Sequence, residues 1–160
     1  MNILVDARAA STLSRSRKIK TVLLATDLSP TSDDATAQAI ELAASLAARF
    51  LVINVIDHDR LVGGISRAAD SAAIRVDQQR ASRERPLLDV VERARVRGLD
   101  ATFLVWTGQP GPGIVAAAEA EKADLVVVGT RGLGRASRFL LGSVSDYVVY
   151  HSSCAVLVAH

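Results

Sequence analysis

The chain alternates short apolar runs with longer segments of helical spacing, and this alternation limits the folds open to it. The apolar runs are TVLLATD (21–27), FLVINVID (50–57), ATFLVW (101–106), DLVVVG (124–129) and CAVLVA (154–159). Runs that are apolar at consecutive positions are typical of strands buried on both faces, as in a parallel sheet covered by helices. We therefore predict a single doubly wound α/β domain with a five-stranded parallel sheet and helices on both faces.

The segments between these runs predict the covering helices. Helical spacing is found in residues 28–50, 70–97, 114–123 and 143–152. Within the second segment, Pro86 requires either a kink or the start of a fresh helix, because proline cannot donate an intrahelical hydrogen bond. GQPGPG (108–113) is expected to be a rigid turn between the third strand and the following helix.

The core of this domain must be built from aliphatic side chains. Of the 160 residues, 49% are hydrophobic but only 4% are aromatic. A domain of this length buries roughly 70% of the surface of its unfolded chain, so it needs no disulfides or metals for stability. The single cysteine, Cys154, excludes an internal disulfide, and its apolar surroundings predict a buried side chain rather than a reactive thiol.

Charge is distributed unevenly along the chain. The net charge is +2, yet residues 1–20 carry five basic side chains against one acidic side chain. We interpret residues 1–18 as a disordered basic tail, with nucleic acid or an anionic membrane surface as the alternative partners of such a segment. No run reaches the roughly 18 apolar residues of a membrane span, and the first residues lack the pattern of a secretory signal. A cytoplasmic protein with neither membrane nor nucleic-acid partners is therefore expected.

In an open α/β sheet, ligands bind beyond the carboxyl ends of the strands, at the point where the strand order reverses. Three predicted strands end in residues suited to a ligand: Ala25 to Asp27, Val55 to Asp57, and Val128 to Gly132. The segment after the fourth strand, GTRGLGRASRFLLGSVSDY (129–147), is the most informative of them.

Glycines in that segment suit a phosphate-binding loop. Gly129 and Gly132 allow close approach of a ligand to the backbone, and Gly142 with Ser143 precedes a predicted helix. Helix N-termini attract anions through unpaired N–H groups and aligned peptide dipoles. Ser143 with Asp146 also matches a capping-box pattern, and the two roles are compatible.

Two common phosphate motifs and one related fold are excluded. A Walker loop requires a lysine, and none follows Lys122, while the dinucleotide fingerprint requires three glycines after the first strand. A response-regulator receiver requires an aspartate at the end of the third strand and a lysine at the end of the fifth. These strands end in VWTG and LVAH here.

The spacing from Gly129 to Ser143, G-xx-G-x9-G-S, resembles the ATP-binding signature of the universal stress protein family. The resemblance extends to VLLATDLSPTSDDA (22–35), DLVVVGTRG (124–132) and LLGSVSDYVVYHSSCAVLVA (140–159). It covers residues 19–159, so the family domain is expected over 19–160. It implies the fold of the adenine nucleotide alpha hydrolases, with strand order 3-2-1-4-5.

The resemblance also implies a site for ATP, with Mg²⁺ as the accompanying ion. The adenosine end would be lined by Ala25, Thr26, Asp27 and Val55. The ribose side would be lined by Val128 and Gly129. The phosphates would be bound by Gly132, Gly142, Ser143 and Val144, and Arg131 is a further candidate for a phosphate contact. Because a carboxylate repels phosphates, Asp27 would have to face the ribose hydroxyls, the base or Mg²⁺.

The arginines of the loop leave two interpretations open. Arg131, Arg135 or Arg138 could reach a phosphate through a charge-assisted hydrogen bond, or each could point to solvent. No general base is evident beside the phosphates, which favours a nucleotide-dependent switch or sensor in the stress response over a committed enzyme. The alternatives are a slow ATPase or phosphotransferase, and an interaction module that binds no nucleotide.

A homodimer is expected to form through residues 154–159. This last strand is short, apolar and predicted to lie at a sheet edge, and an unpaired apolar edge favours pairing with another chain. The family resemblance implies the same pairing.

Overall fold

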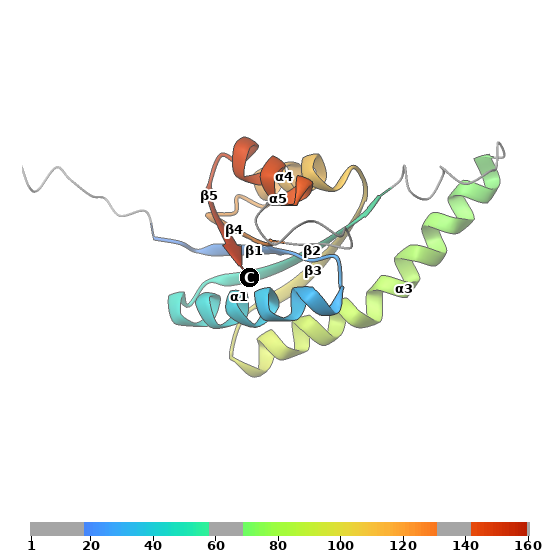
Figure 1. Ribbon diagram of the computed structural model, residues 1–160. Helices are drawn as coiled ribbons and strands as arrows, with labels where there is room; N and C mark the ends of the chain where they lie inside the picture. The colour runs from blue at the N-terminus through green and yellow to red at the C-terminus, as the bar shows by residue number, and fades with distance from the viewer. Residues whose placement is uncertain (1–17, 58–68, 131–141, 160) are drawn as a thin grey trace, which may run out of the picture.

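The computed structural model describes residues 18–57, 69–130 and 142–159, and its centre is a five-stranded parallel sheet (Figure 1). The strands are β1 (Thr21–Ala25), β2 (Arg49–Asp57), β3 (Ala101–Gly108), β4 (Leu125–Gly129) and β5 (Ala155–Ala159). Their order in the sheet is β3-β2-β1-β4-β5. The predicted fold class and strand order are therefore confirmed.

Helices cover both faces of this sheet. They are the 3₁₀ turn η2 (Pro30–Ser32), α1 (Asp33–Leu46), α3 (Ala69–Val96), α4 (Pro110–Ala120) and α5 (Ser143–His151). Figure 1 shows α1 and α3 on one face and α4 and α5 on the other. None of the helices in the described part of the chain combines the length and the apolar character that a bilayer crossing requires.

Two aliphatic cores lie on either side of the sheet, because successive strand residues point to opposite faces. On the α1/α3 side, Leu24, Phe50 and Val52 pack with residues of α3 such as Leu87. On the other side, the core under α4 and α5 is formed by Leu23, Leu51, Ile53, Val126 and Val148. Cys154 packs against this second core but is only half-buried, so the predicted burial is confirmed in part.

The interpretation of GQPGPG as a turn is wrong for most of its length, since α4 begins at Pro110. Proline is well suited to the first turn of a helix, where its missing N–H needs no partner. The glycines allow close packing here: a Cβ on Gly111 would lie 2.9 Å from the Tyr147 ring. The sequence signal that favoured a turn is therefore a signal for a closely packed helix start.

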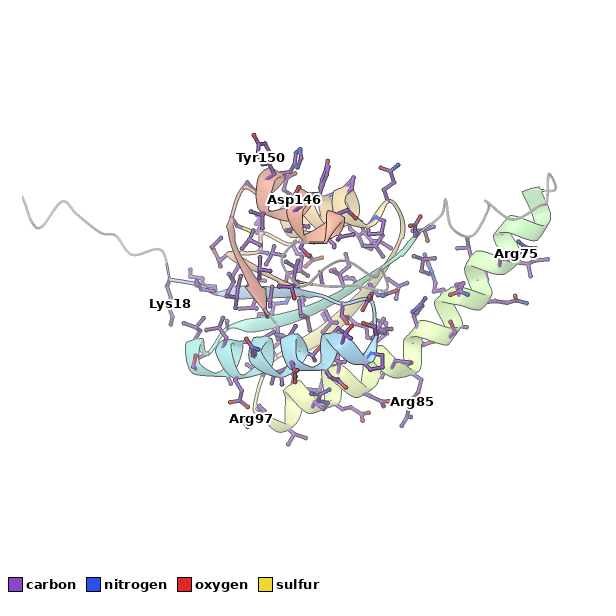
Figure 2. All side chains as sticks on the ribbon, in the orientation of Figure 1. Lys18, Arg75, Arg85, Arg97, Asp146 and Tyr150 are labelled. Carbon is purple, nitrogen blue, oxygen red and sulfur yellow. The ribbon has the colours of Figure 1, made fainter. Side chains whose placement is uncertain are left out.

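The helix α3 runs through Pro86 without a new helix start, so the second of the two alternatives for Pro86 is excluded. Leu87, Val91 and Ala94 are buried and form the apolar stripe of this helix. The part of α3 before Pro86 extends beyond the sheet, where Figure 2 labels Arg75. The backbone turns after the helix at Gly98, whose φ is +80°.

Candidate functional site

The carboxyl ends of β1 and β4 meet at the topological switch point of the sheet. The chain passes from β1 to β2 on one side, whereas β4 pairs with β1 on the other. Ala25 lies opposite Val128 in this pairing, and Gly129 follows at the end of β4. Three residues expected at the site are thus neighbours at the position where doubly wound sheets bind ligands.

The turn after β1 carries Thr26 and Asp27. Thr26 is buried, and the Asp27 side chain is folded back onto its own turn. Oδ1 of Asp27 accepts hydrogen bonds from the N–H of Ser29 at 3.0 Å and from its hydroxyl at 2.6 Å. Oδ2 of Asp27 is buried and has no hydrogen-bond partner in the described structure. The turn therefore presents one carboxylate oxygen that is shielded from water and still able to accept a hydrogen bond.

Two long-range contacts hold this turn, and sequence reasoning missed both. The side-chain amide of Asn54, on β2, donates to the carbonyl of Thr26 at 2.8 Å, and Arg83, on α3, donates to the carbonyl of Asp27 at 3.5 Å. Asn54 is the single polar residue inside the apolar run 50–56, which was the available signal. Arg83 lies in an arginine-rich helix and had no such signal.

Val55 lies on the opposite face of β2 from Asn54, half-buried under the start of α4. A Cβ on Gly113 would lie 3.1 Å from its Cγ1, so helix and strand are in close contact there. Val55 is placed at the carboxyl end of β2, one strand away from the Asp27 turn. The structure thus brings Val55 to the same edge of the sheet as Ala25 and Thr26.

The start of α5 is tied directly to the end of β4. The N–H of Gly142 donates to the carbonyl of Thr130 at 3.1 Å, and the hydroxyl of Ser145 donates to the carbonyl of Gly129 at 2.6 Å. The N-terminus of α5 is therefore held beside the switch point.

Ser143 is not the cap of α5, so the capping-box interpretation is wrong. Gly142 occupies the N-cap position, and no side chain makes a capping hydrogen bond. The first bond within the helix runs from the N–H of Asp146 to the carbonyl of Gly142 at 2.9 Å. The N–H groups of Ser143, Val144 and Ser145 precede that bond and have no acceptor within the helix.

Some expected residues lie outside the described part of the chain. They are Arg131, Gly132, Arg135 and Arg138. Among the residues that the structure does describe, no three His, Cys, Asp or Glu side chains come together as a metal site. Asp27 lies two residues after the end of β1.

Comparison with known proteins identifies the family. The model of the universal stress protein family matches residues 18–160. The chain belongs to this family. A universal stress protein of Thermus aquaticus is 35% identical over 139 residues, which cover 87% of this chain and 97% of the relative. One of Methanocaldococcus jannaschii is 33% identical over 139 residues, covering 87% of this chain and 81% of the relative. The match to one from Synechocystis, 40% identical over 82 residues, spans 51% of this chain and 53% of that protein.

Solved structures of the family share the fold. The universal stress protein UspA from Lactobacillus plantarum has a TM-score of 0.79 at 22% identity, covering 89% of this chain and 99% of its own. A universal stress protein in complex with cAMP has a TM-score of 0.66 at 28% identity, covering 89% and 98%. One from Archaeoglobus fulgidus in complex with dAMP has a TM-score of 0.61 at 19% identity, covering 89% and 99%.

Proposed function

We propose that this universal stress protein binds ATP, with Mg²⁺, at the carboxyl ends of β1 and β4, and acts in the cytoplasm as a nucleotide-dependent switch or sensor. The observation that carries the proposal is the buried and unpartnered Oδ2 of Asp27. The complexes of two family structures with cAMP and dAMP support it, because both ligands are adenine nucleotides.

The hydrogen-bond donors of adenosine suit the unpartnered Oδ2 of Asp27. Leaving a buried polar group without a partner costs about 1–3 kcal/mol, and more for a charged group, so the position favours a ligand that donates to Oδ2. Adenosine carries such donors in its ribose hydroxyls and its 6-amino group. Phosphates carry negative charge and are repelled by the same carboxylate. The adenosine end of the nucleotide therefore belongs beside Asp27, with Ala25 and Thr26 next to it and Val55 packing against the base.

The phosphates belong at the start of α5. The N–H groups of Ser143 and Val144 lack acceptors within the helix, and the helix dipole favours an anion at this end. Val128 and Gly129 lie between the two ends and line the ribose side. Gly132 and Arg131 complete the phosphate side in this proposal. Mg²⁺ would be bound through phosphate oxygens, since the described residues provide no ready cluster of carboxylates.

Binding, rather than turnover, is the main activity that we propose. Backbone N–H groups stabilise phosphate charge without transferring a proton, and Asp27 is assigned to the adenosine end, away from the reacting phosphates. A slow ATPase is the second candidate. Phosphate release by the unaltered protein, above that of a Gly142→Asp variant, would establish it.

Calorimetric titration with ATP and Mg²⁺ tests the proposed function. The Gly142→Asp variant places a carboxylate at the N-terminus of α5, where we place the phosphates. The variant is expected to fold, because φ of Gly142 is −64° and a Cβ there would lie 3.4 Å from the nearest atom, the carbonyl oxygen of Thr130. Aspartate is also a favourable N-cap residue.

We expect micromolar binding by the unaltered protein and no measurable binding by Gly142→Asp. Gly142→Asn is the matched control, since it has nearly the same size without the charge, and it should retain part of the affinity. No binding by unaltered protein free of co-purified nucleotide would refute the proposal. The third alternative, an interaction module that binds no nucleotide, would then be favoured.

We also propose a homodimer that pairs through residues 154–159. The strand β5 is at the edge of the sheet, as predicted, and pairs with β4 on its inner side. Val156 and Val158 are only partly buried. A lysine at Val156 should yield a monomer in sedimentation velocity, whereas a dimer that survives the change would argue against pairing at this edge.

A further inference from the structure

Unpartnered polar atoms gather at the turn after β1. In the described part of the chain, four buried side-chain atoms have no hydrogen-bond partner: Asp27 Oδ2, Asn54 Oδ1, Arg83 Nε and Ser152 Oγ. The first three belong to the turn and to the two side chains that hold it. Because buried polar groups are nearly always paired, three exceptions at one turn indicate that this place serves the ligand site rather than stability.

Two neighbouring backbone carbonyls of the turn accept hydrogen bonds from the side chains that hold it. The amide of Asn54 donates to the Thr26 carbonyl at 2.8 Å, and the guanidinium of Arg83 donates to the Asp27 carbonyl at 3.5 Å. Asn54 is 3% exposed, so its hydrogen bond is shielded from water. The two donors come from β2 and α3 and fix the orientation of two successive peptide groups, one on each side of Asp27.

The turn needs such support because its backbone is strained. Leu28 has φ of 62°, in the left-handed region that residues other than glycine seldom occupy. Its N–H donates to Oγ1 of Thr26 at 3.0 Å, which closes the turn on itself. A strained turn keeps one conformation only where its surroundings determine it. Asn54 and Arg83 come from other elements and hold the turn in its conformation through hydrogen bonds to its carbonyls.

We infer that Asn54 and Arg83 are positioning residues of the nucleotide site, which hold the Thr26 and Asp27 carbonyls so that Oδ2 of Asp27 stays in place for the ligand. The inference rests on the proposed function. Arg83 also brings a positive charge to the side of the turn that carries the Asp27 carbonyl.

Arg83 further connects the site to an exposed helix. It lies on α3 beside the turn after β1, and its guanidinium also donates to Oε1 of Gln79 at 3.4 Å, one turn earlier. The segment before it extends past the sheet (Figure 1). A change in the position of α3 would therefore act on the Asp27 turn through the hydrogen bond from Arg83 to the Asp27 carbonyl.

A double-mutant cycle on the affinity for ATP tests the inference. The single variants are Arg83→Met and Asp27→Asn, and the third is their combination. Arg83→Met keeps an unbranched apolar stem and removes the donors of the guanidinium. If Arg83 acts through Asp27, Arg83→Met weakens ATP binding about threefold to tenfold in the unaltered protein and has no further effect in the Asp27→Asn background. Equal losses in both backgrounds, or no loss in either, would overturn the inference.

Controls separate positioning from general damage. Arg80→Met, at an exposed position on the same helix, should leave the affinity unchanged. Arg83→Lys keeps a donor group and the charge, and should restore most of the affinity lost in Arg83→Met. Asn54→Ser provides a second test with a smaller donor and is expected to weaken ATP binding in the same range. If the unaltered protein binds no ATP, the proposed function fails; if it binds and the cycle is additive, only this inference fails.

Discussion

The two strand ends at the switch point are built in different ways. At the end of β1, the ligand-facing candidate is a side chain, Asp27, held by side chains from β2 and α3. At the end of β4, the candidates are backbone N–H groups of Ser143 and Val144, held by the tie between Ser145 and Gly129. One end offers a single acceptor of defined position, and the other offers donors that any anion can use.

This difference indicates how the two ends divide recognition. A carboxylate oxygen accepts only from a donor placed within hydrogen-bond distance, so in the proposed function we expect the β1 end to select for adenosine. Backbone donors at a helix start bind negative charge with little regard to the rest of the ligand. Substitutions at the two ends should therefore weaken the binding of different parts of the same nucleotide.

Apart from Gly142→Asp, the largest effect on ATP binding is expected for Asp27→Asn. The change replaces an acceptor by an amide of nearly the same shape, and the lost charge-assisted hydrogen bond should weaken ATP binding about tenfold to a hundredfold. Binding of inorganic tripolyphosphate, which lacks adenosine, should not weaken. Calorimetry with both ligands measures this, and an equal loss for tripolyphosphate would contradict the division between the two ends.

A smaller effect is expected for Ser145→Ala at the other end. Its hydroxyl is buried and donates to Gly129 at 2.6 Å, so its loss should lower the free energy of unfolding by about 1 kcal/mol. Because the start of α5 is then less firmly held, the affinities for ATP and for tripolyphosphate should both fall, a few fold each. Thermal unfolding and calorimetry give the two values.

The matched control for this change is Ser143→Ala. The Ser143 side chain is exposed and makes no cap, so the free energy of unfolding should not change. The affinity for ATP should change less than it does in Ser145→Ala. The reverse ranking of the two variants would show that the hydroxyl of Ser143, rather than the backbone, binds the phosphates.

The smallest effect is expected for Gly113→Ala. The added methyl would lie 3.1 Å from Val55, so Val55 must shift slightly, while alanine improves helix propensity by about 1 kcal/mol. These opposing terms should leave stability nearly unchanged and reduce ATP affinity about threefold through the shifted base contact. Pro112→Ala, at the exposed neighbouring position, should not change the affinity.

The apolar runs and their helical partners predicted the sheet and its covering helices, because burial on both faces of a strand leaves a continuous apolar pattern. The resemblance to the family directed attention to Asp27 and Gly142. The start of α4 and the absence of a Ser143 cap were not predicted. Local patterns such as GQPGPG and Ser-x-x-Asp are compatible with more than one backbone conformation, and packing against Tyr147 and Thr130 selects among them.

The sequence by itself determined the fold class and the order of its elements, and it predicted which residue types stand at the strand ends, because hydrophobic period and glycine spacing are local properties of the chain. Only the tertiary structure decided which other side chains support those residues. Asn54 reaches Thr26 across 28 residues and Arg83 reaches Asp27 across 56. Contacts over such separations form only when sheet and helix pack together, and no local pattern records them.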